Sequence, residues 1–305
     1  MSNGKRVFVT GGGGFLGRTV VPLFSKAGWQ VDAPCSKDCD LRQVQSLFDR
    51  RNSYDLILHL AAWTQAGDFC LHHPGEQWLI NQQINTNVLS WWHESQPGAK
   101  AVFIGTSCAY DPDLPLVEEN YLLGTPIDSL YVYAMTKRML EIGARALRKQ
   151  FGLSYMTLVP GTLCGPYYHE DGRQMHFIYD LARKILHAKK SGAPAVLWGD
   201  GHQRREITAV SDFANAMLAL VEHGSAWGEL INLGAGQDHS IRDFAQAICK
   251  STGASASLVK YDVSRYTGAK SKRLQIDKIK KFINWEPTPY RECINMVLSA
   301  LSSEK

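Results

Sequence analysis

Hydrophobic and polar positions follow two different spacings along the first half of the chain. Short apolar runs rich in β-branched residues predict buried strands, and longer segments with apolar residues three or four apart predict amphipathic helices. The two kinds of segment alternate, which is typical of a parallel sheet with helices on both faces. The predicted strands are 5–10, 29–33, 56–60, 101–105 and 154–159, and the predicted helices are 15–26, 41–51, 77–93 and 133–150.

The rhythm becomes less regular after Gly165-Pro166. The later segments predict helices at 177–189, 212–222, 241–252 and 290–302, with a strand at 196–198. At 305 residues the chain is long enough for a large domain and a smaller partner region. We therefore expect a doubly wound α/β domain of the Rossmann type at residues 1–165. Residues 166–305 are expected to bind substrate mainly, with segments that return to the first domain.

A glycine-rich loop joins the first predicted strand to the first predicted helix. Its glycines follow a G-x-x-G-x-x-G spacing, which lets the backbone turn tightly and approach a pyrophosphate at a helix N-terminus. An isolated match of this kind is often only a flexible turn, but this one opens a strand and helix unit and therefore favours nucleotide binding. The expected cofactor contacts are Gly11, Gly14, Phe15, Leu16 and Gly17, with Leu60, Ala61 and Ala62 after the third strand.

The end of the second predicted strand bears on the choice between NAD and NADP. A carboxylate there usually binds the ribose hydroxyls, whereas a cation accepts a 2′-phosphate. Ser36 and Lys37 stand at this point, so NADP(H) is preferred, with NAD(H) as the alternative if Asp32 or Asp38 occupies the position instead. Asp40-Leu41 is expected to contact the adenine amino group; a carboxylate at a helix N-terminus is an equally weighted interpretation of Asp40.

Tyr133 and Lys137 are four residues apart and so share one helical face. An ammonium beside a phenol lowers the phenol pKa and lets the tyrosine exchange a proton near neutral pH. With 12 tyrosines in the chain, chance alone gives about one such pair. Its position adds weight, because the pair follows the strand that ends at Thr106-Ser107-Cys108, and a doubly wound sheet binds ligands at the carboxyl ends of its strands.

The glycine loop, Thr106 and the Tyr133/Lys137 pair resemble the extended short-chain dehydrogenase/reductase family over nearly the whole chain. The resemblance implies that Tyr133 gives a proton to a sugar oxygen, that Lys137 binds the nicotinamide ribose, and that Thr106 replaces a usual serine hydroxyl. Further motifs resemble those family members that act as 3,5-epimerases and 4-reductases on a GDP-linked 4-keto-6-deoxysugar. These motifs are Gly105–Tyr110, Tyr133–Lys137, Val159-Pro160, Gly165-Pro166, Trp198–Gly201 and Arg205-Glu206.

The same resemblance implies an epimerisation pair, with Cys108 as base and His176 as acid. A ketone at carbon 4 acidifies the protons on carbons 3 and 5, so a base and an acid on opposite faces can invert both centres. The alternatives are a small buried thiol for Cys108 and a surface histidine for His176, and His169 is the nearest rival for the acid.

The resemblance also implies a set of substrate contacts. Guanidinium groups suit a nucleotide diphosphate, and the ordinary alternatives are solvated surface charge and, for the tryptophan, core packing. Thr162 replaces an asparagine of the family, which leaves a heptose or dideoxy sugar, a reductase without epimerase activity, and a redox-neutral NAD-dependent epimerase open. The expected contacts are Thr106, Ser107, Thr162, Trp198, Arg205 and Arg273.

Composition narrows the partners and the cellular location that we expect for the protein. The 33 basic and 29 acidic side chains give a net charge of +4, and the basic residues are scattered, so neither nucleic acid nor a membrane is an expected partner. No apolar stretch is long enough to span a bilayer, and seven irregularly spaced cysteines fit reduced thiols without a metal site, so we expect a cytoplasmic protein. The resemblance implies a homodimer through helices 77–93 and 133–150, with Trp91-Trp92 either in that interface or in the core.

Overall fold

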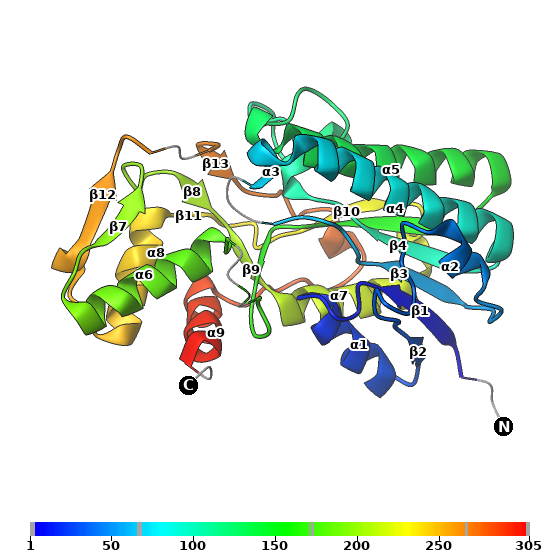
Figure 1. Cartoon of the computed structure of the whole chain (residues 1–305), viewed down its shortest axis with the longest axis horizontal. Helices are drawn as coiled ribbons and strands as arrows, with labels where there is room; N and C mark the ends of the chain where they lie inside the picture. Colours follow the sequence, from blue (N-terminus) through cyan, green and yellow to red (C-terminus); the bar gives the residue numbers. More distant parts are fainter. Residues whose placement is uncertain (1–3, 66–68, 170, 172–173, 266–267, 303–305) are drawn as a thin grey trace.

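A parallel β-sheet forms the centre of the protein, whose computed structural model describes residues 4–65, 69–169, 171, 174–265 and 268–302. Its six strands lie in the order β10-β5-β4-β3-β1-β2, and all neighbouring strands run parallel. The strands are β1 (Arg6–Thr10), β2 (Gln30–Asp32), β3 (Leu56–His59), β4 (Lys100–Ile104), β5 (Tyr155–Pro160) and β10 (Leu230–Leu233). The expected doubly wound α/β fold is confirmed (Figure 1).

Helices cover both faces of this sheet (Figure 1). Because side chains alternate along a strand, Val7 and Val9 of β1 pack on one face while Phe8 packs on the other. The first face carries α1 (Gly17–Lys26) and α7 (Val210–Glu222). The second carries α2 (Val44–Phe48), α4 (Pro74–Ser95) and α5 (Tyr131–Phe151), and the short α3 (Phe69–His72) precedes α4.

The later part of the chain builds a second hydrophobic core from α6 (Phe177–Ser191), α8 (Ile241–Thr252) and α9 (Tyr290–Ser302). Three small sheets flank it and connect it to the site. They pair β7 (Ala195–Trp198) with β12 (Val259–Asp262), β8 (Arg204–Arg205) with β11 (His239–Ser240) and β13 (Ser271–Lys272), and β6 (Thr162–Cys164) with β9 (Ile207–Ala209). Strand β10 and helix α7 belong to this half of the sequence yet lie with the six-stranded sheet. The boundary at residue 165 stays a prediction.

The second predicted helix is shorter than expected, since it covers Val44–Phe48 and not 41–51. The Asp40 carboxylate accepts the backbone N–H of Arg42 at 3.0 Å, and Gln43 has an extended backbone (φ −101°, ψ 102°). A side chain that accepts the backbone N–H two residues later competes with the hydrogen bonds of a first helical turn, so the helix begins later.

Trp91 and Trp92 are completely buried. Trp91 contacts Phe8 with ring centroids 4.9 Å apart, and Trp92 contacts Phe103 at 5.6 Å. Of the two interpretations of this pair, core packing beneath α4 is therefore correct.

Within the residue ranges given above, none of the helices combines the length and the apolar character that a membrane crossing needs.

Candidate active site

The strand order reverses at β1, which has β2 on one side and β3 on the other. Such a reversal opens a crevice at the carboxyl ends of the strands, where the loops after β1 and β3 diverge. Gly11 begins the loop after β1 with φ +70°, and a Cβ there would lie 2.8 Å from the backbone nitrogen of Ala61, which follows β3. Leu60 and Ala61 are partly buried and Ala62 is exposed beside this loop.

The start of α1 has the features of a phosphate cradle. A Cβ at Gly17 would collide with the carbonyl oxygens of Gly11 and Gly12, so the loop folds tightly only around glycine. Gly14 donates its N–H to the Gly11 oxygen at 3.0 Å, and Leu16 at the helix start provides no side-chain cap. An uncapped helix N-terminus behind a glycine loop fits a dinucleotide pyrophosphate.

The end of β2 corrects one expectation. An acidic residue does stand there, because Asp32 is the last residue of the strand. Its carboxylate pairs with Arg50 at 2.9 Å and accepts a hydrogen bond from the Tyr54 hydroxyl. Asp32 is thus already neutralised, while Ser36 and Lys37 beyond it are exposed, an arrangement that suits a 2′-phosphate better than a free ribose.

The predicted adenine contact is more crowded than expected. The Asp40 carboxylate pairs with the Arg42 guanidinium at 2.7 Å, and this hydrogen-bonded partner lowers the pKa of Asp40. The Leu41 carbonyl accepts a hydrogen bond from the Asn87 amide at 2.8 Å. An adenine amino group at Asp40 would have to share the carboxylate with Arg42.

The chain turns sharply after β4 and places Thr106 and Cys108 together. Thr106 is 8% exposed, its Oγ1 accepts the Cys108 N–H at 3.3 Å, and its own N–H donates to the Tyr121 hydroxyl at 3.3 Å. Ser107 and Cys108 in the turn Ser107–Ala109 are partly buried. Sequence reasoning missed Tyr121, which lies 15 residues away and is fully buried.

Helix α5 packs against this turn and brings Tyr133 to it. Lys137 is 4% exposed, its Nζ donates to the Ile104 carbonyl at 2.8 Å, and it lies 6.0 Å from the centre of the Tyr133 ring. Burial lowers the pKa of Lys137 to about 8. Desolvation, with Cys108 acting in the same direction, raises the pKa of Tyr133, so the expected lowering of the phenol pKa by Lys137 is wrong for the protein without ligands. The phenol is protonated at neutral pH and is available as a proton donor.

A buried polar chain joins the cofactor crevice to α5, and sequence reasoning missed it. His59 on β3 pairs with Thr10 Oγ1 at 2.8 Å and with the Asn85 amide at 3.2 Å. Asn85 in turn donates to the Thr136 carbonyl at 3.3 Å. Burial, and then the charge of Lys137, lower the pKa of His59 to about 3, so it is a neutral structural link.

The segment that carries His176 lies against the glycine loop. Phe15 contacts the Tyr168 ring with centroids 5.2 Å apart, and the Tyr168 hydroxyl accepts the His176 N–H at 2.9 Å. His176 has an exposed surface, yet protein atoms around its imidazole exclude much of the water. This desolvation lowers the pKa of His176, and the charges of Lys272 and His169 lower it further. His169, the rival, pairs with Asp171 at 3.5 Å.

Lys272 is the cation that reaches the Cys108 sulfur among the contacts of the described residues. Its Nζ lies 3.5 Å from Cys108 Sγ. Sequence reasoning missed it and chose Arg273, which instead lines a separate hollow of about 280 Å³ with Ala235 and Lys280. Neighbouring basic residues in one loop gave no signal to distinguish them, because the difference lies in which side chain faces Cys108.

The other predicted substrate contacts lie on the small sheets. Arg205 pairs in register with Lys272 across β8 and β13, and donates to the Ala269 carbonyl at 2.7 Å. Trp198, at the end of β7, is 43% exposed, so core packing is the wrong interpretation for this side chain. Thr162 is partly buried at the start of β6.

Glu206 is a buried carboxylate that holds together the loops around Arg205 and Lys272. It is 3% exposed, and its carboxylate accepts three backbone N–H groups, from Leu274 and Ala235 at 2.9 Å and from Gly236 at 3.2 Å. These bonds join the link between β8 and β9 to the loop after β10 and to the segment after Lys272. Burial outweighs the three donors and raises the pKa of Glu206 to about 7.

This shift predicts a pH dependence of stability. Between its ordinary pKa of 4.5 and the folded value of about 7, Glu206 binds a proton more tightly in the folded protein than in the unfolded chain. The free energy of unfolding should therefore fall as pH rises through this window, by up to about 3 kcal/mol. Urea unfolding between pH 5 and 8 measures it, with Glu206→Gln, which does not titrate, as the reference.

The stability of the wild type relative to Glu206→Gln should decline with rising pH. Glu222→Gln, an exposed change on α7, should leave the pH dependence as it is in the wild type. A wild-type advantage over Glu206→Gln that stays constant from pH 5 to 8 would contradict the assignment.

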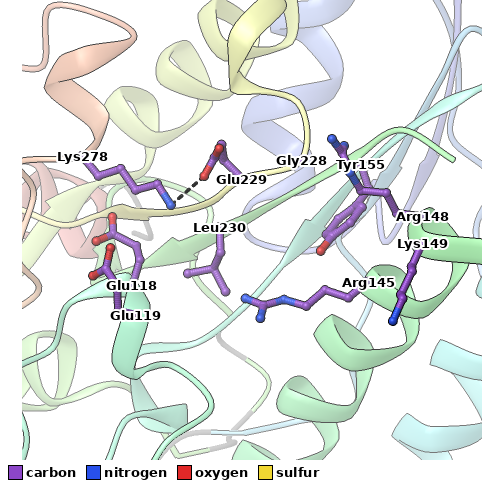
Figure 2. A pocket seen from close by; sticks show the side chains of 10 residues that line it. All are labelled: Glu118, Glu119, Arg145, Arg148, Lys149, Tyr155, Gly228, Glu229, Leu230 and Lys278. Atoms are coloured by element: carbon purple, nitrogen blue, oxygen red, sulfur yellow. Dashed lines mark ion pairs between the residues drawn. The ribbon is translucent and has the colours of Figure 1, made fainter. Parts of the chain in front are cut away.

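A larger cavity, of about 470 Å³, lies away from these residues (Figure 2). It opens where β5 and β10 begin and is lined by charges of both signs, among them Arg145, Arg148 and the Lys278–Glu229 ion pair at 2.8 Å. Arg145 is 12 residues beyond Tyr133 on α5, a separation of about 18 Å along a helix. Among the described residues we find no cluster of His, Cys, Asp and Glu suited to a metal ion.

Comparison with known proteins shows the family of the chain. Residues 7–234 match the NAD dependent epimerase/dehydratase family, and the chain belongs to this family. It is an NAD(P)-dependent nucleotide-sugar oxidoreductase or epimerase.

Individual relatives cover almost the whole chain. A GDP-L-fucose synthase from Azorhizobium caulinodans is 28% identical over 94% of this chain and 93% of its own length. A GDP-L-colitose synthase from Yersinia pseudotuberculosis is 26% identical over 91% of each chain. A solved GDP-L-fucose synthetase from Naegleria fowleri, bound to NADP, superposes with a TM-score of 0.83 at 22% identity over 99% of this chain and 95% of that chain. NADP(H) is thus used within the family.

Proposed function

We propose that the protein catalyses NADPH-dependent 3,5-epimerisation and 4-keto reduction of a GDP-linked 4-keto-6-deoxysugar. The observation that carries the proposal is the meeting of Thr106, Cys108 and Tyr133 at the end of β4, where α5 packs on the turn Ser107–Ala109. A hydroxyl, a thiol and a phenol in one crevice supply the groups that both reactions need. Relatives that are synthases of GDP-L-fucose and GDP-L-colitose support a GDP-linked substrate.

In the reduction, Tyr133 and Thr106 act at the sugar 4-oxygen. Bound NADPH supplies the hydride that adds to carbon 4. Tyr133 donates a proton to the 4-oxygen, and Thr106 donates a hydrogen bond through its O–H, while one of its two lone pairs accepts the Cys108 N–H. The buried ammonium of Lys137 stabilises the phenolate that remains on Tyr133.

In the epimerisation, Cys108 removes the protons that the 4-ketone acidifies, and His176 returns protons on the opposite face. The free protein keeps His176 neutral, because desolvation and the charge of Lys272 lower its pKa. An anionic diphosphate beside Lys272 and Arg205 offsets that charge, so substrate binding favours the protonated imidazole. His176 therefore becomes an acid only when substrate is present.

The remaining predicted residues bind and orient. Arg205 pairs with the diphosphate, exposed Trp198 offers a surface for the base, and Ser107 and Thr162 contact the sugar. Gly11, Gly14 and Gly17 hold the cofactor pyrophosphate, and Ser36 with Lys37 holds the 2′-phosphate, as is consistent with the neutralised Asp32.

The direct test is incubation of the protein with GDP-4-keto-6-deoxymannose and NADPH in deuterated water, with NADPH absorbance and product NMR as readouts. We expect NADPH loss together with deuterium at carbons 3 and 5. Loss of NADPH without deuterium would leave a 4-reductase. Exchange without NADPH loss would replace the proposal with a redox-neutral epimerase.

We also propose that the protein is a homodimer that works in the cytoplasm. Helices α4 and α5 expose large apolar side chains, namely Trp78 (41% exposed), Leu79 (69%), Met139 (38%) and Ile142 (44%), as a helix interface between subunits would use. None of the seven cysteines forms a disulfide, in agreement with a reducing compartment. Sedimentation equilibrium measures the mass, and Leu79→Glu should shift it to the monomer.

A further inference from the structure

We propose that Lys272 is a positioning residue whose ammonium, held against the Cys108 sulfur, makes that sulfur more reactive and so prepares the base of the epimerisation. The proposal rests on the proposed function only in the use to which the reactive sulfur is put. The contact between the ammonium and the sulfur follows from the structure of the chain.

Hydrogen bonds fix the backbone on both sides of the contact between Lys272 and Cys108. Lys272 Nζ lies 3.5 Å from Cys108 Sγ, although the two residues are 164 positions apart. Strand β13 holds Lys272 in register with Arg205, and the preceding Ser271 donates its hydroxyl to Asp238 at 2.7 Å. On the other side the Cys108 N–H is bonded to Thr106. Neither backbone is free to carry its side chain away.

The thiol is the only polar group within bonding distance of the Lys272 ammonium in the part of the chain that the structure describes. An ammonium without a carboxylate partner, placed beside a thiol, favours the thiolate, which is the nucleophilic and basic form of cysteine. The nearby Arg205 uses its guanidinium on backbone oxygens. Lys272 therefore has no competing acid that would cancel its charge at Cys108.

Two other thiols provide an internal contrast. Cys70 on α3 is 5% exposed and close enough to influence Cys108, and burial raises its pKa to about 11. No cation among the described residues is found to lower the pKa of Cys70. Cys35 is exposed and donates its S–H to the Asp38 carboxylate at 2.9 Å. Cys108 is thus the thiol in this comparison that faces a positive charge.

The titratable groups around Lys272 and Cys108 do not cancel the positive charge of the lysine. Tyr133 and Cys70 lie near Cys108 and are protonated, so neither offers a negative charge to the thiol. The charge of Lys272, and after it that of His169, disfavours a proton on His176. One ammonium therefore sets the base and keeps the acid unprotonated until an anionic substrate arrives.

The test is the alkylation rate of Cys108 in the full-length protein without substrate. Iodoacetamide forms a sulfur–carbon bond with the thiolate and releases iodide, and peptide mass spectrometry follows each cysteine separately. At pH 7 we expect Lys272→Met to slow alkylation of Cys108 on the order of fivefold, the size of one exposed charge at this distance. Lys272→Arg should restore most of the rate, and Cys35 serves as the reference thiol in every sample.

Lys260→Met is the matched control, because Lys260 is an exposed lysine on β12. It should leave the rate at Cys108 unchanged, and thermal melting confirms that each variant is folded. Equal rates at Cys108 in wild type and folded Lys272→Met would overturn the proposal, even if the variant binds the GDP-sugar more weakly, since that result assigns Lys272 to the diphosphate alone. A slower rate in Lys272→Met, together with no deuterium exchange by the wild type, would uphold the thiolate and reject the proposed epimerisation.

Discussion

Replacement of Tyr133 by phenylalanine should lower kcat for NADPH oxidation about 10³-fold, the usual contribution of a positioned proton donor. The change removes one hydroxyl from a ring that lies 6.0 Å from Lys137 Nζ and keeps the ring itself. Because the phenol has a raised pKa and is protonated in the free protein, the wild type enters the reaction with a proton to give. The sugar 4-oxygen would then have to take its proton from water.

Tyr131→Phe is the matched control, since Tyr131 lies two residues earlier on α5, is 42% exposed and undergoes the same loss of a hydroxyl. It should keep near wild-type kcat. NADPH binding, followed by cofactor fluorescence, should survive in both variants. A Tyr133→Phe protein with more than about a tenth of wild-type kcat would remove Tyr133 from the role of proton donor.

Arg138→Met should lower the free energy of unfolding by about 4 kcal/mol, the expected loss of several charge-assisted hydrogen bonds at a buried site. The Arg138 side chain donates to the carbonyls of Ala109 at 2.9 Å, Gly124 at 2.8 Å and Leu123 at 2.6 Å. It is 5% exposed, so methionine leaves the buried carbonyl of Ala109 and the part-buried carbonyls of Leu123 and Gly124 without their donor. Because Ala109 follows Cys108, the variant should also lose catalytic turnover.

Arg148→Met tests the same change ten residues later on α5, where the arginine is exposed. It should cost less than about 1 kcal/mol, as is usual for surface substitutions. Urea unfolding measures both variants. A loss at Arg138 no greater than that at Arg148 would mean that water or neighbouring donors replace the guanidinium.

The fold was readable from the sequence because its signals are local. Helix α8 begins and ends at the predicted residues, Ile241 and Thr252, since Ser240 and Asp243 form a capping box and Gly253 adopts a left-handed conformation at the other end. The second helix was too long in the prediction because nothing in hydrophobic spacing reveals that the Asp40 side chain binds the Arg42 backbone.

The site was readable only where its residues share a motif. Thr106 and Tyr133 come from short patterns whose spacing carries a meaning. Lys272 and Glu206 act through contacts that span 164 and 68 residues, and a single sequence contains no signal for such partners. The place of Asp32 at the end of β2 was missed because the spacing of apolar residues does not mark the last residue of a strand. Its neutralisation was not readable either, since it depends on Arg50, 18 residues away.

The place of β10 in the sheet has a consequence for synthesis of the chain. Until residues 230–233 leave the ribosome, β5 is the bare edge of a five-stranded sheet, and its Thr157–Pro160 backbone lacks the partner that covers it in the finished protein. The six-stranded sheet thus cannot be completed before about half of residues 166–305 has been made. A nascent chain that pauses before β10 is made exposes the unpaired edge of β5, which can pair with a strand of another chain. We therefore expect chaperones to matter most at this stage of synthesis.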